Sequence, residues 1–179
     1  MNRQDLRSHI EAIENAGHVV RITREINKDT ELMPLYRWQW RGGFAPSKRK
    51  AFIFENVTDS LGRHYDMPVV VGVLGASREV MAIGMHSDAD GIRECWDNAT
   101  RNPVQPKMME QGPVNEIVHK GDDLLKDGGG LLTMPIPIST PGFDPAPYLT
   151  SPYCVTKDPD TGIINVGTYR VMIKSQTTA

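Results

Sequence analysis

The sequence predicts an α/β domain over residues 1–102, followed over residues 103–179 by the beginning of a β-rich, barrel-like domain. In the first part, apolar residues at helical spacing alternate with short β-branched runs, which is typical of α/β folds. From Asn102 onward the chain is rich in proline and glycine, so a long helix is not expected there.

The first predicted helix begins near Asn2, a preferred N-cap residue, and ends at Gly17, a natural C-terminal stop. Apolar residues recur between them on one helical face, at Leu6, Ile10 and Ile13. The β-branched run over residues 18–23 then predicts a short strand.

A second helix is predicted after Thr30, which is a suitable cap, with Pro34 near its start and Gly42-Gly43 after its end. Four of its residues are interpreted as core or interface residues: Leu32, Leu35, Tyr36 and Trp38.

Two further strands are expected over residues 51–57 and 68–73. The second is a valine run, the pattern of a strand covered on both faces. Two more helices are expected over residues 78–83, after Gly75-Ala76-Ser77, and over residues 88–100.

The proline-rich part contains a strand candidate over residues 114–119 and a predicted hairpin. Strands over residues 153–157 and 163–174 flank the turn at residues 158–162, where proline is second and glycine last. Because so β-branched a final strand needs partners on both sides, we expect the sequence to be cut off inside a domain.

The composition argues against several classes of protein. Twenty Lys and Arg residues against 22 Asp and Glu give a net charge of −2, which does not indicate nucleic-acid binding. No apolar run approaches the ~20 residues that span a bilayer. Residues 1–14 carry five charges, unlike a signal peptide. Cys95 and Cys154 lie far apart without a CxxC motif, so we expect reduced thiols in a cytoplasmic protein.

No familiar local catalytic signature is present, but the stretch Ile164–Arg170 carries chemistry. Asn165 offers a neutral oxygen that suits a hard cation such as Mg²⁺ or Mn²⁺. Thr168 offers a hydroxyl and a backbone N–H to a phosphate, and Arg170 offers a planar fork to a carboxylate or phosphate. An ordinary hairpin strand with a solvent-facing arginine is the alternative that the residues alone leave open.

Several motifs in this chain closely resemble the UbiD family of prenylated-FMN-dependent decarboxylases. They are Thr150-Ser151-Pro152-Tyr153, Thr156-Lys157-Asp158-Pro159-Asp160-Thr161-Gly162 and Asn165-Val166-Gly167-Thr168-Tyr169-Arg170. Upstream segments stand in family order as well: residues 5–17, 52–57, 72–78 and 137–142.

The resemblance implies a fold and a site. The fold is an N-terminal α/β region followed by a split β-barrel, similar to flavin reductases, that holds prenylated FMN. Asn165 is then a ligand of Mn²⁺, and Thr150, Thr168, Tyr169 and Arg170 line or contact the cofactor. Arg170 is also the catalytic residue that faces the substrate carboxylate, within a Glu-Arg-Glu network. Prenylated FMN and Mn²⁺ are the implied cofactors, with K⁺ as a further candidate.

The resemblance also implies an activity and partners. The activity is reversible decarboxylation of aromatic, hydroxybenzoate-type or α,β-unsaturated carboxylic acids. The small-molecule acid is one partner, a flavin prenyltransferase supplies the cofactor, and the full-length protein is a homo-oligomer. The second metal carboxylate and both catalytic glutamates of the family fall beyond residue 179, so the chain is expected to be catalytically incomplete.

Two other functions stay open. The chain could be a non-catalytic flavin-binding or assembly subunit of a multi-subunit carboxylase, or an unrelated flavin-reductase-like barrel that binds ordinary FMN.

One geometric expectation concerns Asn165 and Arg170. Side chains alternate along a strand, so five residues of separation put these two on opposite faces. The implied site needs both, which predicts an irregularity between them. Gly167 lies there, so we predict a break or bulge at Val166 to Thr168.

Overall fold

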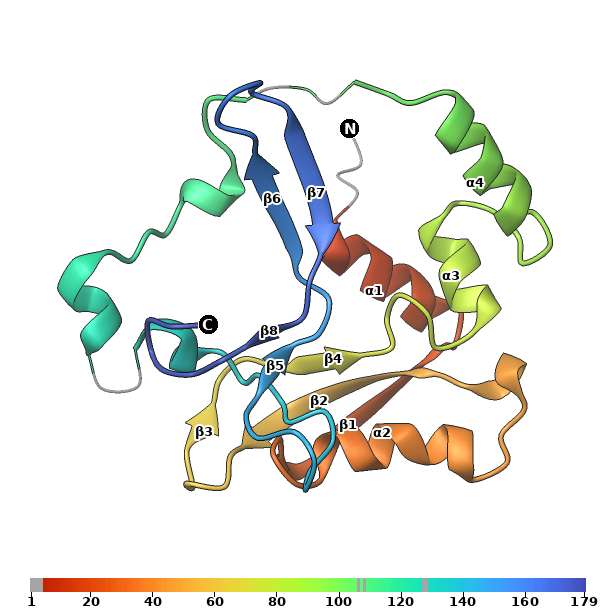
Figure 1. Ribbon diagram of the computed structural model, residues 1–179. Helices are drawn as coiled ribbons and strands as arrows, with labels where there is room; N and C mark the ends of the chain where they lie inside the picture. The colour runs from red at the N-terminus through yellow and green to blue at the C-terminus, as the bar shows by residue number, and fades with distance from the viewer. Residues whose placement is uncertain (1–4, 106, 108, 127–128) are drawn as a thin grey trace. The chain divides into compact units, whose positions relative to one another are not determined.

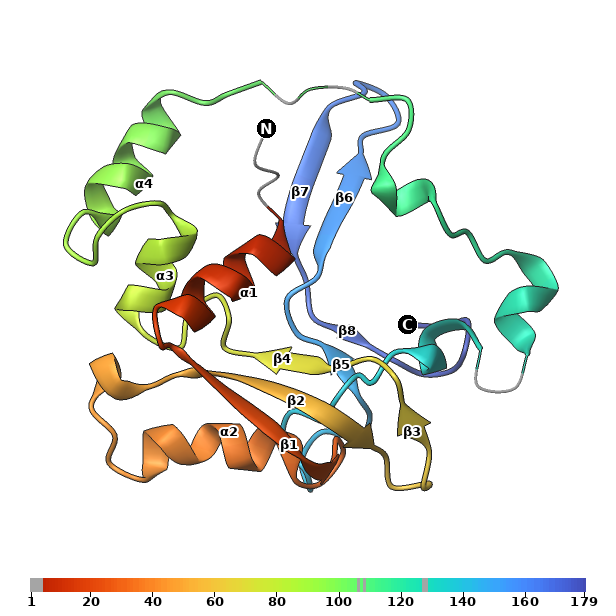
Figure 2. The same ribbon diagram turned by 180° about the vertical axis from the view of Figure 1, so that it is seen from behind.

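The computed structural model describes residues 5–105, 107, 109–126 and 129–179. The chain forms two compact units, each made of several stretches of sequence (Figure 1 and, from behind, Figure 2). The first unit contains residues 1–24, 35–56 and 68–118, and the second contains residues 25–34, 57–67 and 119–179.

Helix α1 spans Leu6–Asn15, and its beginning is fixed by a reciprocal pair of hydrogen bonds. The backbone N–H of Ser8 donates to the carboxylate of Asp5, and the N–H of Asp5 donates to the hydroxyl of Ser8, both at 3.0 Å. Such a capping box satisfies N–H groups that the first helical turn leaves without partners. Asn2, the predicted cap, lies outside the described residues.

Four strands form one sheet: β1 (Val19–Asn27), β2 (Ala51–Thr58), β3 (His64–Tyr65) and β4 (Val69–Val71). Their order is β1-β2-β3, and β4 also pairs with β2. Both β3 and β4 run antiparallel to β2. The predicted strands are confirmed, although β1 extends beyond residue 23 and β4 is shorter than expected. The two-residue strand β3 is too short to leave a periodic signal in the sequence.

Three further helices follow the predicted order: α2 (Leu32–Arg41), α3 (Arg78–Gly84) and α4 (Ile92–Arg101). The hydroxyl of Ser77 caps α3 by accepting the N–H of Val80 at 3.3 Å. In α2, Leu32 and Tyr36 are buried as expected, whereas Trp38 is 65% exposed and belongs to no core of the described residues. The cap and stop residues therefore identified the helix correctly, and of the residues interpreted as core or interface, Trp38 is not part of the core.

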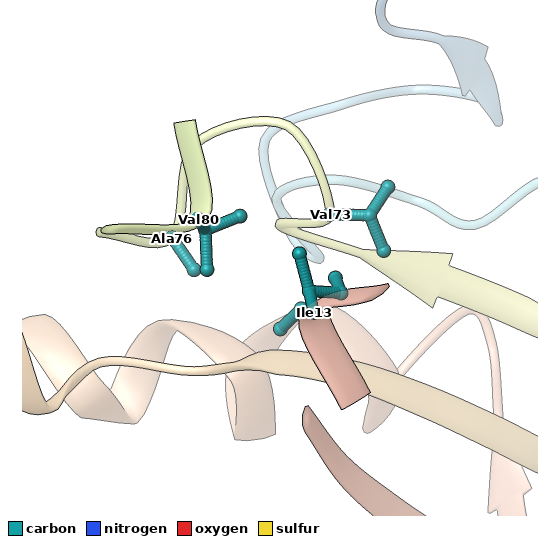
Figure 3. Packing of buried hydrophobic residues seen from close by; sticks show 5 residues of the cluster. Ile13, Val73, Ala76 and Val80 are labelled. Carbon is teal, nitrogen blue, oxygen red and sulfur yellow. The ribbon is translucent and has the colours of Figure 1, made fainter. Parts of the chain in front are cut away.

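The core of the first unit is a cluster of small and branched side chains, Ile13, Ala51, Val73, Ala76 and Val80. Figure 3 shows Ile13 of α1 gathered with Val80 of α3 and with residues from the turn between β4 and α3. Burying a side chain of this size typically stabilises a fold by about 1.5–3 kcal/mol. The cluster therefore holds α1 and α3 together in the first unit.

Tyr36 packs into the same unit against β2 and the turn that follows β4. Its ring meets that of Phe52 edge-on, with 5.6 Å between centroids. Burial raises the pKa of Tyr36 to about 12. Gly72 has φ +77°, and a Cβ built there would overlap the Tyr36 ring. This position therefore needs glycine for its backbone angle and for the space that the ring occupies.

The strand predicted over residues 114–119 is wrong. Residues 113–115 form a short 3₁₀ turn, and no strand of the described chain includes residues 116–119. Val114 is 88% exposed. An apolar run becomes a strand only when a neighbour supplies ladder partners, and none does so here.

The second unit contains two short antiparallel ladders. One pairs β5 (Tyr148–Leu149) with β8 (Val171–Met172), and the other pairs β6 (Tyr153–Lys157) with β7 (Ile164–Thr168). The predicted hairpin is confirmed. Its turn is closed by the carboxylate of Asp158, which accepts the N–H groups of Asp160 and Thr161 at 3.0 and 2.7 Å. The single strand predicted over residues 163–174 is divided into β7 and β8.

The described residues thus have a mixed α/β fold. Both cysteines, Cys95 and Cys154, are free, as the sequence predicts. None of the helices in the described ranges is long and apolar enough to cross a lipid bilayer.

Gly72→Ala and Gly43→Ala form a matched pair of substitutions. Both glycines have φ +77°, but only at Gly72 would the new Cβ meet another group, the Tyr36 ring. We expect Gly43→Ala to lower the free energy of unfolding by about 1–2 kcal/mol, the cost of a left-handed backbone angle. Gly72→Ala should cost about 1–3 kcal/mol more, because the ring must move. Urea unfolding followed by tryptophan fluorescence measures both, and equal losses would contradict the packing at Gly72.

Candidate functional site

The two ladders of the second unit are joined by chain stretches of unequal length. In the first ladder Leu149 is opposite Val171, and in the second Tyr153 is opposite Thr168. Between these pairs lie three residues on one side, 150–152, and two on the other, 169–170. We call these five residues the junction; in Figure 1 it is where the chain leaves β7 and bends toward β8. Pro152 has no N–H to donate to a ladder, which favours a break here.

The position predicted for the irregularity is therefore wrong. The ladder is unbroken through Val166, Gly167 and Thr168, and its end pair is Thr168 with Tyr153. An irregularity is nevertheless present at the junction, where strict alternation stops. An odd separation between Asn165 and Arg170 therefore no longer forces their side chains onto opposite faces.

The predicted site residues fall into two groups. Thr150 directly follows Leu149 and Arg170 directly precedes Val171, so both lie at one end of the β5–β8 ladder. Thr168 and Tyr169 lie at the adjoining end of the β6–β7 ladder. The structure thus brings three of the five candidates into the junction, Thr150, Tyr169 and Arg170, and a fourth, Thr168, to the strand end beside it.

Asn165 is the fifth candidate and lies farther into β7, opposite Thr156. Its side chain is exposed and shares a face with Gly167, while Thr168 points to the other face of the strand. Within the described residues, no hydrogen bond joins Asn165 to the junction.

Gly167 has a different role from the one predicted. A Cβ built at this position would overlap the ring of Tyr169, two residues later in the chain. Glycine is therefore required by a close approach of the tyrosine ring and not by a bulge.

Arg170 is held by two groups that the sequence analysis did not identify. Its Nη2 donates to Oδ1 of Asp144 at 2.7 Å. Its guanidinium carbon lies 3.9 Å from the centroid of the Tyr148 ring, close enough for a cation–π contact. Although the side chain is 49% exposed, it is not the solvent-facing arginine of an ordinary hairpin.

Asp144 is itself anchored in a closed turn. Its Oδ2 accepts the N–H of Thr140 at 2.8 Å, and its own N–H donates to the carbonyl of Thr140 at 2.9 Å. The side chain is only 13% exposed. Hydrogen bonding from Arg170 lowers the pKa of Asp144, so the carboxylate is ionised at neutral pH.

The described residues can supply only part of a metal site. Within the described residues, no three His, Cys, Asp or Glu side chains come together in a way that could hold a metal ion. Asn165 offers one neutral oxygen, which suits a single position around Mn²⁺ or Mg²⁺. The described residues therefore fit one ligand of such a site and not a complete one.

A cavity of about 500 Å³ also lies in the second unit, lined by residues that include Leu124, Leu131 and Gln176. None of the candidate site residues lines it. The candidate site is therefore the open junction and not this cavity.

Asp144→Asn tests what the ion pair contributes to stability. Because the folded state lowers the pKa of Asp144, the ionised carboxylate stabilises the fold. This stabilisation is fully present above the pKa of an unfolded-state aspartate, about 3.9, and is lost as the pH falls through the lower pKa of the folded state. We expect the wild type to exceed the variant in free energy of unfolding at about pH 6–7, with the difference shrinking below roughly pH 4. Urea titrations across this range measure it. The same substitution made in an Arg170→Ala protein should have a smaller effect at pH 7, and an undiminished effect would contradict the assignment.

Two known sequence families match the chain, one after the other. Residues 10–96 match the 3-octaprenyl-4-hydroxybenzoate carboxy-lyase N-terminal domain. Residues 107–179 match the 3-octaprenyl-4-hydroxybenzoate carboxy-lyase Rift-related domain of the UbiD family.

Solved structures agree with these matches. An evolved dimeric form of the UbiD-class enzyme HmfF from Pelotomaculum thermopropionicum, in complex with prFMN, is 27% identical, with 95% of this chain and 36% of that chain covered and a TM-score of 0.76. The open form of the Sedimentibacter hydroxybenzoicus vanillic acid decarboxylase, ShVdcCD with truncated ShVdcD, is 25% identical, with coverages of 98% and 37% and a TM-score of 0.76. A 3,4-dihydroxybenzoic acid decarboxylase from Enterobacter cloacae is 26% identical, with coverages of 96% and 35% and a TM-score of 0.76.

The chain spans little more than a third of the length of these relatives. Its mixed α/β fold matches their N-terminal region, in agreement with the order of the two family matches along the sequence. The chain therefore belongs to the UbiD family and corresponds to the N-terminal portion of its members.

Proposed function

We propose that this chain is part of a UbiD-type carboxy-lyase that uses prenylated FMN and Mn²⁺. The observation that carries the proposal is Arg170. It lies at the junction beside Thr150, Thr168 and Tyr169, within a segment that matches the family, and it is held in place by Asp144. A preorganised guanidinium is suited to a carboxylate or a phosphate.

The proposed substrate is an aromatic acid of the hydroxybenzoate type, with α,β-unsaturated acids as the wider class. Two of the similar proteins are decarboxylases of vanillic acid and of 3,4-dihydroxybenzoic acid, which are both hydroxylated benzoic acids. A third was solved with prFMN. Similarity to these proteins supports the substrate class and the cofactor proposed for this chain.

The residues of the chain have distinct proposed roles. When bound, prenylated FMN supplies the electron sink for decarboxylation. Thr150 and Tyr169 contact the cofactor from the junction, and Thr168 contacts it from the end of β7 beside the junction. Asn165 contributes one oxygen ligand to Mn²⁺, and the remaining metal ligands and any K⁺ site come from outside the described residues.

Arg170 is the proposed catalytic residue. Its planar fork binds the substrate carboxylate and orients the bond that breaks, an effect that depends on a fixed geometry. The proton that replaces CO₂ needs a general acid, and the glutamates implied by the resemblance would supply it.

The rest of the proposal concerns the whole protein. Residues 103–179 form the beginning of a split β-barrel that holds the cofactor, after an α/β domain over residues 1–102. The full protein is a cytoplasmic homo-oligomer that obtains its cofactor from a flavin prenyltransferase.

Asn165→Ala should weaken Mn²⁺-dependent retention of the flavin and leave the fold intact. Water can replace one neutral ligand in part, so a loss of affinity is expected instead of unfolding. Flavin occupancy measured by absorbance, with and without added Mn²⁺, gives the result. Thr156→Ala, on the neighbouring strand directly opposite, is the matched control and should retain the flavin. Wild-type occupancy and Mn²⁺ dependence in the Asn165 variant would exclude Asn165 as a ligand.

Arg170→Ala should lower the decarboxylation rate of the holoenzyme by at least about 100-fold, the usual effect of removing one preorganised electrostatic group. Flavin should remain bound, because other residues of the junction also contact it. Release of CO₂ from 3,4-dihydroxybenzoate measures the rate. Lys157→Ala removes an exposed cation of the same hairpin and should keep normal activity. A near-normal rate in the Arg170 variant would reject its catalytic role, whereas flavin binding without turnover in the wild type would favour a non-catalytic subunit.

A further inference from the structure

We propose that Asp144 is the positioning residue of the site: together with the Tyr148 ring, it fixes the guanidinium of Arg170 so that one edge faces the substrate carboxylate. This inference rests on the proposed function and deepens it. It assigns a role in the site to two residues outside the motif that carries Arg170.

The two contacts restrict different motions of the guanidinium. The cation–π contact, with 3.9 Å from the guanidinium carbon to the Tyr148 ring centroid, limits movement of the guanidinium away from the ring. The hydrogen bond of 2.7 Å from Nη2 to Asp144 limits rotation within that plane. An arginine side chain otherwise loses rotamer entropy when it binds a ligand. Here that loss is incurred on folding, before substrate arrives.

Both supporting groups are themselves fixed. Asp144 is bonded through its side chain and its backbone to Thr140, which leaves Oδ1 aimed at Arg170. Tyr148 lies in the β5–β8 ladder, directly opposite Met172. Its hydroxyl lies 3.1 Å from the sulfur of Met172. The ring is therefore carried by the same ladder that begins one residue after Arg170.

The arrangement leaves part of the guanidinium available. The only ion pair of Arg170 within the described residues uses Nη2 and one oxygen of Asp144. A guanidinium has five N–H donors, and a carboxylate is best bound by two parallel ones. Nη2 has two N–H groups and belongs to both two-donor edges, one shared with Nε and the other with Nη1. Because Asp144 accepts from Nη2 alone, one of these edges keeps both donors and can bind a substrate carboxylate while Asp144 stays in place.

The negative charge of Asp144 makes it possible to distinguish a positioning role from a contribution to substrate affinity. It offsets part of the charge on Arg170, so removing it should not weaken ground-state attraction for an anionic substrate. Loss of Asp144 should instead let the guanidinium turn away from the productive orientation. This predicts a fall in kcat with KM unchanged or lower, which differs from the higher KM expected when a binding contact is lost.

The deciding experiment compares Asp144→Asn with Asp158→Asn in the complete, flavin-loaded protein. Both aspartates accept backbone N–H groups in a turn, but only Asp144 pairs with an arginine. Asparagine keeps one oxygen acceptor for the turn and removes the charge. With 3,4-dihydroxybenzoate as substrate, Asp144→Asn should lower kcat by about tenfold or more without raising KM, since small misplacements can cost up to about 100-fold. Calorimetric titration with benzoate should show equal or tighter binding, and Asp158→Asn should match the wild type.

Tyr148→Leu gives an independent test should Asp144→Asn fail to fold. It removes the ring and leaves the Asp144 turn untouched, and it should lower kcat in the same manner, whereas Tyr148→Phe should not. An active wild type whose Asp144→Asn variant keeps its kcat, or changes only in KM, would overturn the positioning role alone. A wild type without decarboxylase activity would overturn the proposed function and this role together.

Discussion

The mismatch in length between the two stretches that join the strand ladders is the constraint on which the candidate site depends. Three residues on one side face two on the other, so the ladders cannot merge into one regular pair. A continuous ladder would fix every side chain between Asn165 and Met172 by simple alternation. The break frees Tyr169 and Arg170 from that rule. Tyr169 then lies against Gly167, while Arg170 reaches Tyr148 and Asp144.

Much of the fold could be predicted because its signals are local. Apolar spacing and capping residues identified the helices, and the turn chemistry around Asp158 identified the hairpin. The errors came where a neighbour decides the outcome. The apolar run from Val114 has no ladder partner and forms no strand, and the strand expected over residues 163–174 is divided where the two ladders meet. Propensity and periodicity describe what a segment can do, and packing decides what it does.

The residues of the candidate site likewise divide into those that a local sequence motif identifies and those that only the fold brings together. The residues from Asn165 to Arg170 were found together because they are adjacent in one motif. Asp144 and Tyr148 were missed, because only the fold brings them to Arg170 from more than twenty positions away. The resemblance did include residues 137–142, which end two positions before Asp144. The position of Asp144 shortly after Pro141-Gly142 was therefore a signal in the sequence. Its pairing with Arg170, however, could not be recognised without the structure.

The packing of Tyr36 on Gly72 also bears on how such sequences can diverge. The glycine has a left-handed backbone angle, and the tyrosine ring occupies the space where a side chain would begin. Neither position can change freely while the other is kept. A larger residue at position 72 would be tolerated only after position 36 had become smaller and the turn after β4 had taken a different backbone path. Substitutions at these two positions should therefore occur as a pair during divergence, with Tyr36 replaced before Gly72.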